Sequence, residues 1–496
     1  MKSSNRAGLP NGALDAAAIK AAVAVGIVTL VLGLAMAIGL WMPGPFYDDA
    51  YFSGPAIRFA TTGEMKNFLL DMDAIPKISD LPLFYTPIYF YALGYWFALF
   101  GCSTVAALCF YAILAAASSV GVSLSLSRLG CAPHWCLGSA LISWTSFYAA
   151  TVYGLRAEPL ALAFLLVGLP LIPSSFSLLQ CAGFFLTGLA CIAAPRVAGW
   201  AVAFGGLFLV GALDRVRITA RNAVIGGGLA LLLLILSVRL EFSAFYKTFT
   251  AHAALRTPSI QSSLAIVLDF MTNGFGKFNW LGVTVVLVSG AVAGLVVGRW
   301  RAIYPLLITF GLGYFFALLT GGYAEVIFIY IVALGLWGIL GQVPKVPYLP
   351  AIMLTACAIL AGVPLIIVSL SFFKAKYQSP ELWADYRKIE SAVSSRQWRE
   401  VWIDHFSLRY VFDMRPPLIA RLANSRLTAL AKDPVPKDSE TSSVLSEAIL
   451  HKAAPDLFPD EPGIRVLGRV FKINARPQIH FITHEGIIIS TRDPSQ

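Results

Sequence analysis

The sequence predicts an all-α polytopic membrane protein that ends in a small α+β domain. Two observations carry this prediction. Of the 496 residues, 57% are hydrophobic and only 13% are charged. A soluble globular domain shows no such excess of apolar residues, whereas a bundle of spanning helices requires it. The apolar character stops near residue 371, beyond which the chain is charged and mixed in composition.

Runs of about 17–25 apolar residues are long enough to cross the hydrocarbon core of a bilayer. The sequence contains eleven such runs, which lie near residues 20–42, 103–127, 135–153, 158–173, 177–194, 197–213, 222–239, 279–298, 302–320, 323–340 and 347–371. The first run has no small-residue cleavage site before the charged loop that follows it, so we expect a retained membrane anchor rather than a signal peptide.

Basic residues in the short connections predict the orientation of these spans, because such connections stay in the cytoplasm. The basic groups are Arg215, Arg217 and Arg221 in one connection, Arg299 and Arg301 in another, Lys345 in a third, and Lys2, Arg6 and Lys20 at the N-terminus. An eleven-span count places all four groups on the cytoplasmic side.

The apolar run from Phe84 to Phe100 is rich in Tyr, Phe and Trp, side chains that prefer the membrane interface. Counting this run as a twelfth span would invert every later loop, so we expect an interfacial or re-entrant helix on the outer side. The chain then divides into a transmembrane module, residues 1–371, with outer loops 43–102 and 240–278, and an extracytoplasmic domain, residues 372–496. In that domain we expect helices near 380–398 and a strand-like tail at 479–489.

The formal net charge of +10 does not indicate nucleic-acid binding, because the basic residues are scattered and form no Lys/Arg-rich run. We expect them to set the orientation and to contact anionic membrane lipids. The seven cysteines fall in or beside apolar segments and show no CxxC spacing. Structural disulfides and a zinc site are therefore not expected.

The acidic first outer loop is the foremost candidate for chemistry, because carboxylates in so apolar a chain cost free energy unless they serve a purpose. Asp48 and Asp49 are adjacent and lie within a few residues of the membrane exit. Such a pair suits a general base or a cation site. It equally suits the N-terminal cap of an interfacial helix, and the spacing alone does not decide between these interpretations.

Three further charged residues lie at the outer ends of expected spans. Arg156 and Glu158 are expected to pair, either as a helix-terminal ion pair or as part of a polar cavity. The position of Glu158 at a helix start favours the first interpretation. Arg196 has no carboxylate within four residues. It therefore either extends to the lipid headgroups or binds an anion such as a lipid phosphate.

Two residues outside the first loop complete the candidate set. His252 lies in the second outer loop, where a surface histidine is the ordinary interpretation. Glu325 lies two residues into an apolar helix, so we expect it to face a polar cavity rather than lipid.

Four segments occur in order along roughly the first 200 residues: FYDDAYFSGPAIRFATTGEM, YTPIYFYALGYWFALFG, LRAEPLALAFLL and GLACIAAPRVAGW. Together they resemble the membrane-embedded GT-C glycosyltransferases that use polyprenyl-phosphate sugars, particularly the bacterial relatives of protein O-mannosyltransferases and lipid A aminoarabinose transferases. The segments are similar to that family's acidic outer loop, its Pro-aromatic segment, its Arg-x-acid helix start and its basic residue before Gly, here Arg196. One departure is Tyr85-Thr86-Pro87, which stands where the aminoarabinose-type enzymes carry Lys-Pro-Pro. The resemblance therefore implies no phosphate-contacting lysine at this position of the chain.

The resemblance implies transfer of a sugar from a polyprenyl-phosphate donor to a lipid, glycan or protein acceptor, at the outer face of a bacterial plasma membrane. Asp48 or Asp49 would be the base for the acceptor hydroxyl, and Arg196, with Arg156, would bind the departing phosphate. No cofactor is implied, although the carboxylate pair leaves a divalent cation open. The substrate cavity would be lined by the remaining polar candidates, Glu158, Tyr85, Glu325 and His252.

A secondary transporter or lipid flippase is the alternative, since it would also need many spans and a few buried charges. Such proteins typically show repeated halves with broken helices at mid-membrane depth. The sequence shows no internal repeat, and its ionisable residues collect at one face of the predicted bundle.

Overall fold

The structure is a computed structural model of the chain. It describes residues 16–40, 42, 47–65, 86–128, 132–149, 156–194 and 219–239, most of 241–246, short helical pieces near 197–201 and between 352 and 373, and seven strands from residue 400 onward. For residues 47–52 and for the strands it describes the backbone alone. The expected spans at 197–213, 279–298, 302–320 and 323–340 lie wholly or largely outside these residues, as do the helices expected near 380–398.

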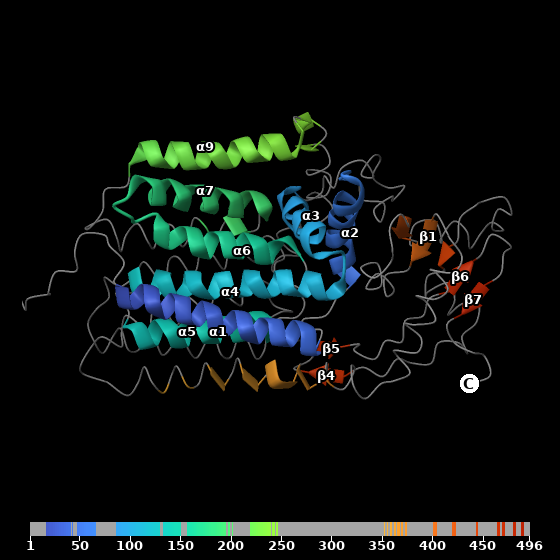
Figure 1. The fold of residues 1–496 in the computed structure, drawn as a ribbon, viewed down its shortest axis with the longest axis horizontal. Helices are drawn as coiled ribbons and strands as arrows, with labels where there is room; N and C mark the ends of the chain where they lie inside the picture. Colours follow the sequence, from blue (N-terminus) through green and yellow to red (C-terminus); the bar gives the residue numbers. More distant parts are fainter. Residues whose placement is uncertain are drawn as a thin grey trace, which may run out of the picture.

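Within residues 16–246 every described element is a helix. The helices are α1 (Ala16–Leu40), α2 (Tyr47–Thr62), α3 (Ile88–Phe100), α4 (Thr104–Arg128), α5 (Pro133–Ala149), α6 (Ala157–Gly168) with the 3-10 turn η3 (Leu169–Leu171), α7 (Ser177–Ala193) and α9 (Ala220–Ser237). The long helices lie side by side, with α4 against α1, α5 and α6, and α7 against α6 and α9 (Figure 1). Six of the expected spans coincide with α1, α4, α5, α6 with η3, α7 and α9 to within a few residues.

Three described helices have the length and hydropathy of a membrane span, namely Ala16–Leu40, Val105–Arg128 and Ala220–Ser237. The apolar helices Ile88–Phe100, Ala157–Leu171 and Ser177–Ala193 are shorter. The described part of the chain therefore contains three candidate spans by length and composition.

The helices α1 and α9 bury small side chains and expose large ones. α1 buries Ala22, Gly33 and Ala37, and α9 buries Gly226 and Ala230. The exposed side chains of the same helices are aliphatic, among them Ile27, Val31, Ile38, Val224, Leu229 and Leu236. A helix of a soluble protein shows the opposite arrangement, with large apolar side chains buried, because water drives such side chains inward. Small residues between helices and aliphatic faces outward are typical of spans in lipid, and they indicate a membrane protein.

Glycines bring the helix backbones into direct contact. A Cβ atom on Gly121 of α4 would overlap the backbone carbonyl of Leu166 in α6, and one on Gly226 of α9 would overlap the backbone carbonyl of Cys181 in α7. Because no side chain intervenes, dispersion contacts between many atoms hold these helices together.

A network of buried amides joins the N-termini of α7 and α9. Gln180 Oε1 accepts hydrogen bonds from Thr219 N at 3.0 Å, Thr219 Oγ1 at 3.0 Å and Asn222 Nδ2 at 2.9 Å. Its Nε2 donates to Ile172 O at 3.1 Å, and Ser177 Oγ donates to Asn222 Oδ1 at 2.8 Å. In apolar surroundings, where water cannot supply hydrogen bonds, polar side chains must form hydrogen bonds within the protein.

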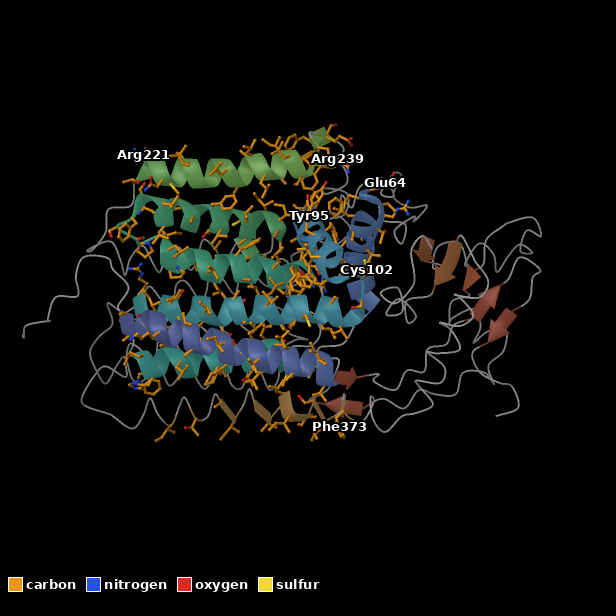
Figure 2. All side chains as sticks on the ribbon, viewed as in Figure 1. Glu64, Tyr95, Cys102, Arg221, Arg239 and Phe373 are labelled. Carbon is orange, nitrogen blue, oxygen red and sulfur yellow. The ribbon has the colours of Figure 1, made fainter. Side chains whose placement is uncertain are left out.

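The two ends of the bundle differ in their residues. Arg128, the last residue of α4, donates from Nε to Pro170 O at 3.1 Å, next to this amide network. We call this the Arg128 end. The opposite end holds the C-terminus of α7 and the N-terminus of α4. Figure 2 shows Arg221 and Arg239 at the two ends of α9, with Tyr95, Cys102 and Glu64 toward the Arg239 side.

The short helix α3 is tied at both of its ends to the end opposite Arg128. Before α3, Thr86 Oγ1 donates to Ile192 O near the C-terminus of α7 at 2.6 Å. Within α3, Trp96 Nε1 donates to Ala106 O near the start of α4 at 2.7 Å. A helix of 13 residues is about 20 Å long, which is less than the roughly 30 Å of the hydrocarbon core. That this segment is an interfacial or re-entrant helix on the outer side stays a prediction. We call this end, which α2 shares, the α2–α3 end.

The described residues beyond 400 form short strands. β1 (Glu400–Ile403) pairs in parallel with β2 (Ile419–Leu422), and β4 (Ile464–Val466) pairs antiparallel with β5 (Arg469–Phe471). A three-stranded sheet has the order β3 (Ser443–Val444), β6 (His480–Ile482) and β7 (Ile488–Ser490). The tail expected to be strand-like at 479–489 is thus two antiparallel strands, with His480 opposite Ser490. That residues 372–496 fold as one domain stays a prediction.

Three consecutive glycines of α9 provide a matched test of the helix packing. A Cβ atom on Gly226 would overlap Cys181 O and lie 2.8 Å from Phe184 Cβ. We expect Gly226→Ala to lower the midpoint of thermal unfolding in detergent, because overpacking costs about 1–3 kcal/mol. A Cβ atom on Gly227 or Gly228 meets nothing within 4 Å. Alanine at either position should leave the midpoint unchanged or raise it through helix propensity. Equal midpoints for the three variants would contradict the close contact between α7 and α9.

Candidate functional site

The α2–α3 end carries the acidic pair that the sequence singles out. Asp48 and Asp49 are the second and third residues of α2, so both lie in its first turn. Unpaired backbone N–H groups and the helix dipole favour negative charge there. The two carboxylates therefore either stabilise the start of α2 through this charge interaction, or one of them acts as a general base.

Aromatic contacts fix α2 against α3. The Phe59 ring lies 5.1 Å from the rings of both Tyr91 and Tyr95, in edge-to-face geometry. Gly94 makes room for this ring, because a Cβ atom there would lie 2.6 Å from Phe59 Cδ1. Edge-to-face pairs contribute roughly 0.5–1.5 kcal/mol each beyond their buried area, so packing against α3 stabilises the position of the acidic helix.

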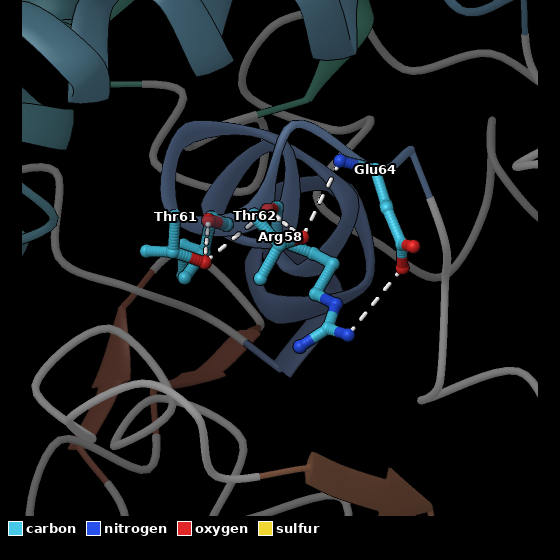
Figure 3. Close-up of polar contacts among 5 residues, drawn as sticks. Arg58, Thr61, Thr62 and Glu64 are labelled. Atoms are coloured by element: carbon cyan, nitrogen blue, oxygen red, sulfur yellow. Dashed lines mark hydrogen bonds and ion pairs between the residues drawn. The ribbon is translucent and has the colours of Figure 1, made fainter.

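Side chains near the C-terminus of α2 donate hydrogen bonds to carbonyls one turn earlier (Figure 3). Thr61 Oγ1 donates to Ile57 O at 2.9 Å, and Thr62 Oγ1 donates to Arg58 O at 2.9 Å. Gly63, which follows the helix, has a φ of 74° and donates from its backbone N–H to Phe59 O at 2.8 Å. Arg58 Nη2 lies 3.4 Å from Glu64 Oε2, and this partly exposed pair adds about 0–1 kcal/mol.

Ser53 of α2 is a buried polar residue that sequence reasoning did not single out. It is 0% exposed, and its Oγ atom has no hydrogen-bond partner among the described residues. Leaving a buried hydroxyl unsatisfied costs about 1–3 kcal/mol. No signal in the sequence marks Ser53, because other helical serines are buried both with a partner, as Ser118 is, and without one among the described residues, as Ser123 is.

Arg156 and Glu158 form the ion pair that the sequence predicts. Arg156 is the N-cap of α6, and Glu158 lies in the first turn of that helix. Arg156 Nη2 lies 3.4 Å from Glu158 Oε1, and the two side chains are 10% and 3% exposed. This separation is longer than the roughly 2.7–2.9 Å of a tight charge-assisted hydrogen bond, so the contact is chiefly Coulombic. Glu158 also offsets the unfavourable position of a cation at a helix N-terminus.

The Thr86–Ile192 hydrogen bond brings together the chain segments of two other candidates. Tyr85 directly precedes Thr86, and Arg196 follows Ala194, the C-cap of α7, by two residues. Tyr85 and Arg196 themselves lie outside the described residues. Sequence reasoning missed Thr86, because its partner lies 106 residues away. His252 and Glu325 also lie outside the described residues.

Cation binding is not decided by the described residues. Among them, no group of three His, Cys, Asp or Glu residues is placed to hold a metal ion. The side chains of Asp48 and Asp49 are outside that set, so a divalent cation at the carboxylate pair stays open. Cys102, in the connection from α3 to α4, is a free thiol whose pKa is raised by burial.

Comparisons with protein-family models, with curated proteins and with solved structures find no match to this chain. Its function is therefore argued from the site itself.

The buried pair can be tested by comparing single and double replacements. We expect Glu158→Gln to destabilise the protein by about 3–5 kcal/mol, because it leaves the Arg156 charge buried without its counter-charge. The double variant Arg156→Met/Glu158→Leu should recover most of this loss, since apolar pairs of similar volume often replace buried ion pairs at little cost. Thermal unfolding in detergent measures both effects. A single variant as stable as the double variant would contradict a buried, coupled pair.

Proposed function

We propose that the protein is a membrane glycosyltransferase that moves a sugar from a polyprenyl-phosphate donor to a lipid, glycan or protein acceptor. One observation carries the proposal: an acidic helix lies at one end of an apolar helix bundle, and a buried Arg–Glu pair lies at the N-terminus of α6, which is directed away from the Arg128 end. A lipid-linked donor presents its phosphate and sugar at the membrane surface, while its hydrocarbon chain stays in the apolar layer. A site at the end of the bundle suits such a substrate.

The proposed reaction needs few catalytic groups. The acceptor oxygen bonds to the anomeric carbon as the bond from that carbon to the phosphate oxygen breaks. Phosphate is already a good leaving group, so the enzyme must supply a base for the acceptor hydroxyl and fixed cations for the departing phosphate. Asp48 or Asp49 serves as the base, and Arg196, with Arg156, binds the phosphate. A single displacement of this kind inverts the anomeric carbon.

The distribution of charge favours this proposal over a secondary transporter or lipid flippase. Transporters hold ionisable residues near mid-membrane depth, at broken helices. In the described helices the charged residues instead lie near helix ends, as Lys20, Arg128 and Arg221 do. In the described part of the bundle, the middle turns of the long helices α1, α4 and α9 thus carry no charged residue.

We place the α2–α3 end on the periplasmic side of a bacterial plasma membrane. Arg128 and Arg221 lie at the opposite end, and the positive-inside rule assigns basic connections to the cytoplasm. The orientation agrees with an eleven-span bundle followed by an extracytoplasmic domain.

Two native cysteines report on this orientation. In single-cysteine variants within right-side-out membrane vesicles, we expect an impermeant maleimide to label Cys102 and to leave Cys131 unlabelled. Burial raises the pKa of the Cys102 thiol, and only the thiolate reacts. Labelling should therefore be slow at pH 7 and faster as the pH is raised toward 9. Outside labelling of Cys131, together with a protected Cys102, would reverse the orientation.

Donor binding tests the function directly. Purified protein in lipid nanodiscs is titrated with short-chain polyprenyl-phosphate hexoses and pentoses, with free polyprenyl phosphate as competitor. We expect Arg196→Ala to weaken donor binding and turnover by about 10–100-fold, the contribution of a hydrogen bond to a charged group. Arg196→Lys should restore only part of the donor affinity and turnover, because the point charge of lysine cannot reproduce the two parallel hydrogen bonds of arginine.

The matched control is Arg239→Ala, which removes an exposed arginine just after α9 and should leave donor affinity unchanged. Unchanged affinity in Arg196→Ala would remove that residue from the site. A folded wild-type protein that binds none of the donors would refute the glycosyltransferase proposal, and movement of a donor across vesicles without sugar transfer would favour the flippase.

A further inference from the structure

We propose that Glu158 is the internal counter-ion of the donor-phosphate site. It pairs with Arg156 while the site is empty, yields the guanidinium to the phosphate of the donor, and repels the more highly charged phosphate of the product. The inference rests on the proposed glycosyltransferase function. It adds to that function a residue that favours release of the lipid phosphate after the sugar has been transferred.

The position of Arg156 is not explained by the stability of α6. Arg156 is the N-cap of that helix, and it makes no side-chain capping hydrogen bond. A guanidinium has no acceptor atom with which to cap a first turn, and its charge is unfavourable at the positive end of the helix dipole. The side chain is nevertheless only 10% exposed. A cation that is kept in such a place favours a role in binding an anion.

In the structure Glu158 supplies an anion at this position. Its Oε1 atom lies 3.4 Å from Arg156 Nη2, and its side chain is 3% exposed. A phosphate that accepts two parallel hydrogen bonds from a guanidinium does so at about 2.7–2.9 Å. Exchange of the carboxylate for a phosphate therefore replaces a longer, chiefly Coulombic contact with a shorter one. Glu158 stays close to the phosphate after the exchange, because it belongs to the first turn of α6.

The packing of α6 against α7 brings this pair to the end of the bundle where the second phosphate ligand is expected. The two helices form an antiparallel hairpin, in which a Cβ atom on Gly168 near the end of α6 would lie 2.9 Å from Gly183 O of α7. The start of α6 and the end of α7 therefore lie at the same end. Arg196 follows Ala194, the C-cap of α7, by two residues, so its segment starts at the end that holds Arg156.

The charge of the phosphate changes during the reaction, and Glu158 responds to this change. The donor phosphate is a diester with a single negative charge. In the transfer its bond to the anomeric carbon breaks, and the electron pair leaves with the phosphate oxygen. The product is a monoester with a charge of about −1.5 to −2 at pH 7. Repulsion between buried charges grows with their magnitude and is little screened by salt. The Glu158 carboxylate therefore disfavours the product more strongly than the donor.

Removal of the Glu158 charge tests the inference, because it should tighten phosphate binding, whereas damage to the fold weakens binding. Wild-type protein and Glu158→Gln in lipid nanodiscs are titrated with short-chain polyprenyl phosphate and with a short-chain donor. We expect Glu158→Gln to bind polyprenyl phosphate about tenfold more tightly, since one like charge is removed beside the phosphate in a buried site. The donor should gain a smaller factor.

Thermal unfolding gives a second measurement for a variant that is less stable without ligand. Polyprenyl phosphate should raise the unfolding midpoint of Glu158→Gln more than that of the wild type, because tighter binding to the folded state stabilises it more. The double variant Arg156→Met/Glu158→Leu should be folded but bind polyprenyl phosphate about tenfold more weakly than the wild type, since it lacks the guanidinium.

The matched control is Glu64→Gln. The Glu64 carboxylate also lies 3.4 Å from an arginine, Arg58, but its side chain is 50% exposed, so unchanged affinities are expected. Unchanged or weaker binding of polyprenyl phosphate by folded Glu158→Gln, equal gains for donor and product, or wild-type affinity in the double variant would each overturn the inference and leave the glycosyltransferase standing. A folded wild-type protein that binds neither donor nor polyprenyl phosphate overturns both.

Discussion

Helices in lipid lack the hydrophobic driving force that packs helices in water, so close contact through small residues has to hold this bundle together. Gly121 and Gly226 allow neighbouring helices to meet without an intervening side chain, and the large aliphatic side chains of α1 and α9 face outward. The α2–α3 end depends on this packing. Because α3 is tied to α7 and to α4, a shift between those helices would separate Thr86 from Ile192.

Buried polar groups of the described bundle differ in how they are satisfied. At the Arg128 end, Gln180 and Asn222 satisfy one another and the N-termini around them, so their energetic cost is offset within the protein. The Arg156–Glu158 pair is buried as an ion pair at a separation of 3.4 Å. The hydroxyls of Ser53 in α2 and Ser123 in α4 are buried without a partner among the described residues, which costs about 1–3 kcal/mol each.

The α2–α3 end also has the surface that a lipid-linked substrate requires. Tyr95, Leu99 and Phe100 of α3 are exposed, and such side chains suit the zone where headgroups meet hydrocarbon. Phe59 packs α2 against Tyr91 and against the partly covered ring of Tyr95. A polar site beside an apolar surface can bind the two parts of an amphipathic donor at once, which is why the proposed chemistry is located here rather than in the middle of the bundle.

The sequence by itself determined the apolar segments, because the length needed to cross a bilayer is a local property of the chain. The runs expected at 103–127 and 177–194 thus coincide with α4 and α7, and the Arg156–Glu158 pair was predictable because its members are two residues apart. Tertiary structure alone distinguished Gly226 from Gly227 and revealed Thr86 and Ser53. The reason is physical: whether a glycine is crowded or a hydroxyl is satisfied depends on atoms from segments far away in the chain, and only packing decides which of those segments meet.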